Sequence, residues 1–438
     1  MSFDAFVYIE SKNKIDYKSI VYINIIYKHV WLLLLPSEYI QMSYAVSATE
    51  TSAPFHSASA SSKYTPRIVS KTDERDELRF TIDKINVSLA NALRRIILSD
   101  VPTLVFRTFP YSECKASITT NTSRLHNEIL KQRLSCIPIH ITETDFPYQD
   151  YAVEIDVVAD GSEIRYVTTK DFKMKNKTNG KYLTDVKVRE IFSPNAITGD
   201  YIEFARLLPK MTEYGEGERL TMTCDLDIGS AKQDGAFNVV STCAYQMTMD
   251  PAKVDEAWRI KEAELVKEGV AAVGSEEMKA QRKNWSLLDA QRFTKPDSFD
   301  FVVETVGVFT NTDIVSKAAQ IMINKCTKFI RDIESGENHI IPTVSTIQNG
   351  FDIELKGEDY TLGKVIEFFL HDKHYAEDQT VTYCAFRKIH PHNPDSMIRV
   401  GFAETVGVDE GIVAEYVTTC ARDAISVFEH IRDQFREY

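Results

Sequence analysis

The sequence predicts an α+β protein in which two similar units, each a small antiparallel sheet with helices, pack about a pseudo-two-fold axis. Three observations lead to this fold class. Short segments alternate apolar and polar residues with the period of half-buried strands. Longer segments repeat apolar residues three and four positions apart, as amphipathic helices do. Finally, the strand–turn–helix pattern of residues 78–97 returns at residues 351–370.

The first unit is expected at residues 71–140 and 241–335. It opens with the strand "ELRFTIDKI", and Ser88 is a plausible N-cap for the helix that follows. A second helix is expected in "SRLHNEILKQRLSCIP". Its inward-facing residues are expected to be Leu125, Ile129 and Leu134.

Two insertions are expected within this unit. Residues 141–240 are expected to form a mainly β domain, because alternating segments surround an Asp-Gly turn at Asp160 and an Asn-Gly hairpin signal at Asn179. Residues 251–290 carry many charges and are expected to form a helical insertion exposed to solvent on most sides.

A strand at 297–309 and a long helix complete the first unit. The helix carries an apolar stripe, and Gly336 stands where a C-cap glycine belongs.

The second unit is expected at residues 346–438, after a short polar linker at 336–345. Its "FDIELKGEDYTLGKVIEFFL" aligns without gaps on "LRFTIDKINVSLANALRRII", with Asp359 on Asn86. Both units end with a long amphipathic helix. Two such units in one chain are expected to bury their apolar helix faces against each other.

Residues 1–70 are expected to be a disordered or doubtful leader. The apolar segment at 19–40 is interrupted by Lys28 and His29 and closed by Pro36, so it is too short to span a bilayer. Translation from Met42 is an alternative to translation from Met1. No membrane association is expected.

The bulk composition excludes some classes of function. The net charge of −13 argues against non-specific wrapping of nucleic acid, because phosphates require a positive surface. The seven cysteines stand singly, which suits a reducing compartment better than disulfides or a zinc site.

Several ordered motifs resemble one family. "NVSLANALRRIILSDVPTLVF", "LHNEILKQRLSCIPIHI", "YVTTKDF", "FNVVSTCAYQM" and "FDFVVETVG" resemble the larger α-like subunit of multi-subunit RNA polymerases, meaning bacterial α, archaeal D or the third-largest subunit of polymerase II. "KGEDYTLGKVIEFFL" and "VTYCAFRKIHPHNPDSMIRVGF" resemble its smaller partner, archaeal L or the eleventh subunit of polymerase II.

The resemblance implies a non-catalytic assembly platform of a DNA-directed RNA polymerase, dimerised in cis, with the largest, second-largest and smaller polymerase subunits as partners. DNA and RNA would be met only indirectly, through the complex. The joined order is similar to the fused subunit of some large DNA viruses, which implies the virion and the cytoplasmic viral factory; otherwise the chain accompanies a nuclear or cytoplasmic polymerase. Only Cys224 and Cys243 lie in the region where relatives carry a zinc loop or iron–sulfur cluster, so no cofactor or metal is expected.

The paired arginines Arg94 and Arg95 have two interpretations, a solvated helix face or a contact with the second-largest subunit. The resemblance favours the contact, and Asn91 belongs either to that surface or to local hydrogen bonding. The small residues Ala90 and Gly363 suggest the close approach of two helices. The residues expected to bury one unit against the other are Leu89, Leu93, Ile96, Ile97, Val315, Met322, Cys326, Phe329, Leu362, Gly363, Ile366, Phe369, Leu370, Ala424, Phe428 and Ile431.

Other candidate sites are weak. His390 and His392 have His-x-His spacing, but two ligands do not make a metal site. Asp225 and Asp227 alternate in a strand, which is typical of a solvated face. No catalytic residues are assigned, because no nucleophile–base arrangement or phosphate-binding loop stands out. The alternative function is a free-standing self-associating scaffold with the same fold.

Overall fold

The computed structural model describes residues 64–74, 76–142, 146–210, 215–404 and 406–436. Most of the expected leader, including the apolar segment 19–40, lies outside these residues. Residues 67–70 belong to a strand, so the predicted leader boundary at residue 70 is wrong. Among the described helices, none is long and apolar enough to cross a membrane. We call residues 64–336 the first half and residues 337–436 the second half.

Each half contains a four-stranded antiparallel sheet of the same strand order, apart from the sheet of the inserted β domain. In the first half the order is β1 (Arg67–Glu74), β2 (Glu77–Asp83), β12 (Thr294–Thr305), β11 (Val240–Met249). In the second half it is β13 (Ile340–Pro342), β14 (Gly350–Leu355), β16 (Ser396–Phe402), β15 (Val381–Arg387). When the four strands of each sheet are numbered by their order along the chain, their spatial order in both sheets is first, second, fourth, third. The sequence repeat is therefore a repeat of topology.

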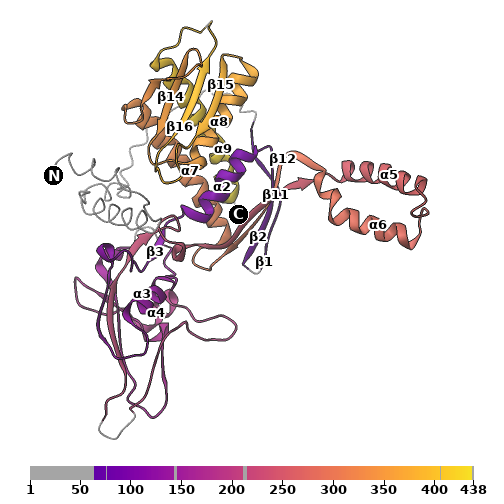
Figure 1. Ribbon diagram of the computed structural model, residues 1–438. Coiled ribbons are helices and arrows are strands. Elements are labelled where there is room, and N and C mark those ends of the chain that lie inside the picture. The colour runs from indigo at the N-terminus through magenta and orange to yellow at the C-terminus, as the bar shows by residue number, and fades with distance from the viewer. Residues whose placement is uncertain (1–63, 75, 143–145, 211–214, 405, 437–438) are drawn as a thin grey trace, which may run out of the picture. The chain divides into compact units, whose positions relative to one another are not determined.

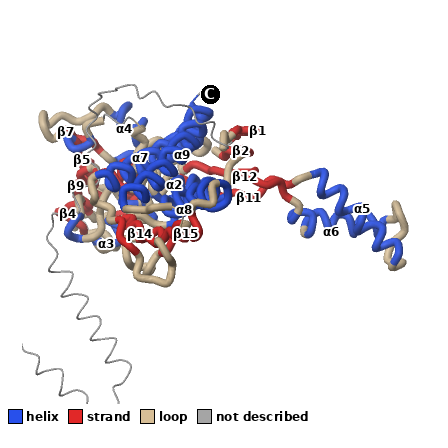
Figure 2. The backbone as a smooth tube through the Cα atoms, turned by 90° about the horizontal axis from the view of Figure 1, so that it is seen from above, coloured by secondary structure: helices blue, strands red, loops and turns tan. Residues whose placement is uncertain are grey.

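The helices follow the same order. A helix comes after the second strand of each sheet, α2 (Val87–Ser99) in the first half and α8 (Tyr360–Phe369) in the second, and a long helix comes after the last strand, α7 (Asn311–Glu334) or α9 (Glu410–Arg436). A π-helical segment at Leu370–Glu377 extends α8. All four helices lie side by side (Figures 1 and 2) and share one hydrophobic core with both sheets. The predicted α+β class is confirmed.

The helix starts differ in one detail from the prediction. The cap of α2 is Asn86, whose side chain accepts the backbone N–H of Ser88 at 2.9 Å. Asp359 caps α8 by accepting from Thr361 N at the same distance, 2.9 Å. Ser88 thus lies inside its helix, because the side chain two residues earlier takes the capping role. Gly336 has φ of +75° just past α7, as predicted for a C-cap glycine.

The inserted β domain begins earlier than predicted. Its core runs from Phe106 to Leu226, not from residue 141, because two elements assigned to the first unit pack into it. These are β4 (Ala116–Asn121) and α3 (Asn127–Ser135). In α3 Leu134 is buried as predicted, but Leu130 is buried in place of Ile129, which is exposed.

The rest of this domain is a four-stranded sheet, two strand pairs and a short helix. The sheet order is β4, β9 (Arg219–Asp225), β5 (Tyr151–Val158), β7 (Lys173–Asn176); the strand pairs are β6 (Arg165–Thr168) with β8 (Glu203–Leu207) and β3 (Thr103–Val105) with β10 (Asp227–Gly229); the helix is α4 (Asp185–Ile191). The Asn179-Gly180 signal is a tight turn, with φ of +70° at Gly180. The Asp160-Gly161 turn joins strands of different sheets.

The charged insertion forms two helices, α5 (Pro251–Lys267) and α6 (Glu276–Leu287), that run side by side between β11 and β12 (Figures 1 and 2). They share a small separate cluster in which Trp258 meets Trp285 with ring centroids 5.4 Å apart. The expected linker at 336–345 contains β13, which pairs with β14, so part of it belongs to the second sheet.

Candidate assembly surface

The apolar faces of the four helices are buried against one another. Every apolar residue predicted for this interface lies in the shared core, and Gly363 is also buried. The contacts pair equivalent elements, since α2 packs on α8 and α7 packs on α9. Equivalent pairing of this kind is the signature of a two-fold relation between similar units.

Arg95 lies at the meeting of α2 and α8. Its guanidinium donates to Asp359 Oδ2 at 2.8 Å and to Thr361 Oγ1 at 2.9 Å. Burial by itself would raise the pKa of Asp359, but hydrogen bonds from Thr361 and the charge of Arg95 outweigh it and lower that pKa. The carboxylate therefore caps α8 and binds the first half at once. This intramolecular partner for Arg95 was not predicted from the sequence.

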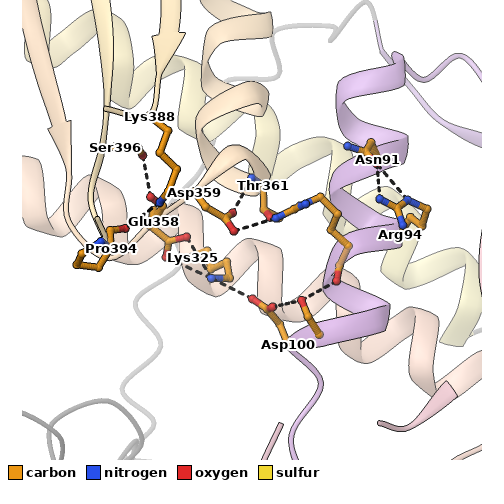
Figure 3. A network of polar contacts seen from close by, with 12 residues as sticks. Asn91, Arg94, Asp100, Lys325, Glu358, Asp359, Thr361, Lys388, Pro394 and Ser396 are labelled. Atoms are coloured by element: carbon orange, nitrogen blue, oxygen red, sulfur yellow. Dashed lines mark hydrogen bonds and ion pairs between the residues drawn. The ribbon is translucent and has the colours of Figure 1, made fainter. Parts of the chain in front are cut away.

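Lys325 forms a second polar contact between the halves. Its ammonium lies 3.1 Å from Asp100 Oδ2 and 3.1 Å from Glu358 Oε2 (Figure 3). All three side chains are nearly buried, with 17% exposure for Lys325 and 14% for each carboxylate. Burial would lower the pKa of Lys325, but Glu358 and Asp100 together raise it well above its usual value. The lysine is a permanent cation held between two carboxylates.

Sequence reasoning missed Lys325, Asp100 and Glu358. A signal for Lys325 was present, because a lysine beside Cys326 falls next to the apolar stripe of α7, where a charge needs a partner. The partners are 225 residues upstream (Asp100) and 33 downstream (Glu358), and only the fold brings them together. We call Arg95, Asp100, Lys325, Glu358 and Asp359 the cross-half charge network.

The side chains of Asn91 and Arg94 do not join the cross-half charge network. Asn91 Oδ1 accepts from Arg94 Nε at 3.1 Å and from its Nη2 at 2.9 Å. Figure 3 places this pair on the side of α2 turned away from Asp359 and Thr361. Of the three residues predicted to contact a large subunit, Arg95 is thus occupied within the chain, while Asn91 and Arg94 bind only each other among the described residues.

The small residue at Gly363 serves a strand rather than a second helix. A Cβ added there would fall on the ring of Phe386 in β15. That ring also packs on Tyr360, with centroids 4.9 Å apart. The close approach of two helices was expected at this position, but the neighbour that requires a small residue is a side chain of the sheet packed against α8.

The remaining candidate residues have structural partners. Asp227 accepts from Arg107 Nε at 2.6 Å, and Arg107 is buried, so Asp227 does not belong to a solvated face. Asp225 pairs with Lys177 at 3.2 Å. The rings of His390 and His392 lie 5.2 Å apart between centroids and are tilted by 37° to each other. Within the described ranges, no group of three or more His, Cys, Asp or Glu side chains is placed to hold a metal.

Cys326, the cysteine predicted for the interface, is a buried thiol. Burial raises the pKa of Cys326 to about 12, which keeps it protonated near neutral pH. It fills space between the helices as a small apolar side chain.

Comparison with known proteins agrees with this architecture. The family described as the RNA polymerase Rpb3/Rpb11 dimerisation domain matches residues 79–326, more than half of the chain. The chain is 25% identical over 300 residues to the DNA-directed RNA polymerases I and III subunit RPAC1 of Bos taurus, covering 60% of this chain and 83% of that protein. It is 27% identical over 281 residues to the DNA-directed RNA polymerase subunit Rpo3 of Pyrococcus horikoshii, covering 61% of this chain and 97% of that protein. The chain belongs to the Rpb3/Rpb11 dimerisation-domain family and is an α-like assembly subunit of an RNA polymerase.

Proposed function

We propose that this chain is a non-catalytic assembly platform whose two halves form an internal dimer, and that this dimer recruits the two large catalytic subunits. The observation that supports it most is the pairing of α2 with α8 and α7 with α9 across one continuous core, between sheets of identical strand order. In this proposal the sheets and four helices are the dimerisation units, and the β domain and the α5–α6 pair are insertions.

Linking the two halves has a physical consequence. A covalent linker replaces a bimolecular encounter with an intramolecular one at an effective concentration of order mM. The internal dimer should therefore form without the concentration dependence of separate subunits. The contacts themselves should be sufficient to hold the halves together once they have formed.

This can be tested by cutting the folded chain. A protease site inserted after Gly336, which is exposed at the boundary between the halves, allows cleavage after folding and leaves β13 with its own sheet. The two pieces should elute together in size exclusion and still copurify with two chains of large-subunit size. Pieces that separate on cleavage would refute the internal dimer.

The recruiting surface is proposed at Asn91 and Arg94. Arg94→Glu should leave helix content unchanged and weaken capture of the second-largest subunit. Lys328→Glu, the same charge change at an exposed position of α7, is the matched control. If Arg94→Glu captures that subunit as well as the control does, the recruiting surface lies elsewhere.

A free-standing self-associating scaffold is the second candidate, because the fold alone would support it. Purification of the tagged chain from its source separates the two. Recovery of the chain without large subunits favours the scaffold. Mass spectrometry of the recovered complex also tests the proposed viral setting, which is motivated by the joined order of a larger-type and a smaller-type half.

A further inference from the structure

We propose that the cross-half charge network selects the partner of each half, so that a first half accepts a second half and like halves reject each other. This rests on the internal dimer of the proposed function and adds a rule for partner choice. The apolar faces cannot supply such a rule by themselves, since hydrophobic burial is non-directional and both halves present similar apolar helices.

The sequence repeat identifies the equivalent positions on α2 and α8. In the gapless alignment, Asp359 stands on Asn86 and Glu358 stands on Ile85. Arg95 stands opposite Phe368 in the same alignment. The second half therefore has two carboxylates where the first half has a neutral amide and an apolar side chain.

The long helices align in the same way. Val315, Met322 and Cys326 of α7 fall on Val417, Ala424 and Phe428 of α9 at a constant spacing, and all six are buried. This alignment places Lys325 on Val427, which is buried in the shared core. Both cations of the cross-half charge network thus belong to the first half and have apolar equivalents in the second.

These substitutions make the two homotypic pairings unfavourable in different ways. If two second halves paired, Glu358 would meet Val427 and Asp359 would meet Phe368. The nearly buried carboxylate of Glu358 and the half-buried one of Asp359 would then have no cation across the interface. If two first halves paired, Lys325 would face the apolar Ile85 in place of the carboxylate of Glu358. Arg95 would face the neutral Asn86 in place of the carboxylate of Asp359. Removing one partner of a buried ion pair is strongly destabilising, and such penalties are an effective source of specificity.

The test reverses one charge pair in full-length chains. One chain carries Lys325→Glu and the other carries Glu358→Lys, each with its own tag and with the same long Gly-Ser insertion after Gly336, so that halves can exchange between chains. Within either chain alone the reversed residue meets a like charge. Between the two chains each cross-half contact again joins a lysine and a glutamate: one is the original Lys325–Glu358 contact, and in the other residue 358 supplies the ammonium and residue 325 the carboxylate, beside the unchanged Asp100.

We expect the two tagged chains, coexpressed, to copurify with each other at least tenfold more than either does with a differently tagged copy of itself. A chain carrying both reversals should be monomeric, with an unfolding midpoint above that of either single variant, because the cross-half ion pair is restored while Asp100 now lies beside a carboxylate. Equal recovery of mixed and self pairs would overturn the inference. So would a doubly reversed chain as unstable as the single ones.

An exposed pair in the same interface gives a matched control. Arg422 of α9 lies 3.8 Å from Glu334 of α7, with 58% and 62% exposure. Reversing this pair in the same two-chain format should give no preference for mixed over self pairs, since solvent screens exposed ion pairs. If the exposed pair selects as strongly as Lys325 and Glu358, burial is not the source of selection. The cleavage experiment tests the internal dimer separately, so its success together with equal recovery here would reject only the selection rule.

Discussion

Replacing Lys325 with Met should destabilise the core between the halves more than any exposed lysine substitution. Methionine keeps the length of the lysine side chain except for its terminal ammonium, so the loss reports mainly on the charge. Asp100 and Glu358 would then remain together at 14% exposure each, without the ammonium now 3.1 Å from both. Breaking a buried pair of this kind costs about 3–5 kcal/mol, or about two to four orders of magnitude in the opening equilibrium.

Hydrogen exchange of the α7 and α9 amides measures this opening directly. Hydrogen exchange reports on the helices themselves. Tryptophan fluorescence would not, because Trp258 and Trp285 lie in the separate α5–α6 cluster. Lys328→Met, at an exposed position of α7, should change exchange little.

A triple variant separates charge from packing. Adding Asp100→Asn and Glu358→Gln to Lys325→Met removes every charge at this contact, so much of the lost protection should return. A Lys325→Met variant that exchanges like the Lys328→Met control, or a triple variant no better than the single one, would refute the reasoning.

Three further outcomes are expected. Hydrogen bonds from Arg399 hold the pKa of Asp352 below its usual value of 3.8. Its stabilisation is therefore full above 3.8 and is lost as pH falls through the lower pKa of the folded state, so Asp352→Asn should flatten the fall of the urea-unfolding midpoint below about pH 4. Gly363→Ala should lower the melting temperature, because displacing the Phe386 ring costs about 1–3 kcal/mol while better helix propensity returns only about 1 kcal/mol; a higher melting temperature would contradict the close contact. Trp258→Ala should cost the α5–α6 pair about 3 kcal/mol and raise its amide exchange, with exchange in α7 and α9 unchanged.

The local spacing of apolar and polar residues determined most of the secondary structure elements and their order. The period of apolar residues placed β2, α2, α7 and α9, and the gapless repeat implied a second unit with the same order of elements. These features depend on residues a few positions apart, which is why one sequence sufficed. The capping error at Ser88 and the inward position at Ile129 were local as well, but there neighbouring residues compete for one role and packing decides between them.

The domain boundary was beyond the reach of local pattern. β4 and α3 have the same periodicity whether they join the first sheet or the inserted β domain. Their membership depends on pairing β4 with β9, about a hundred residues later in the chain. Residue 141 looked like a boundary only because the pattern of the sequence changes there.

The sequence by itself determined the kinds of element, their order and the apolar faces that must be covered, because these follow from side-chain periodicity. The tertiary structure alone decided which charges meet. Arg95 finds Asp359, 264 residues away, and Lys325 is held between carboxylates from both halves. Burial gives such contacts their strength, and burial exists only after the helices have packed.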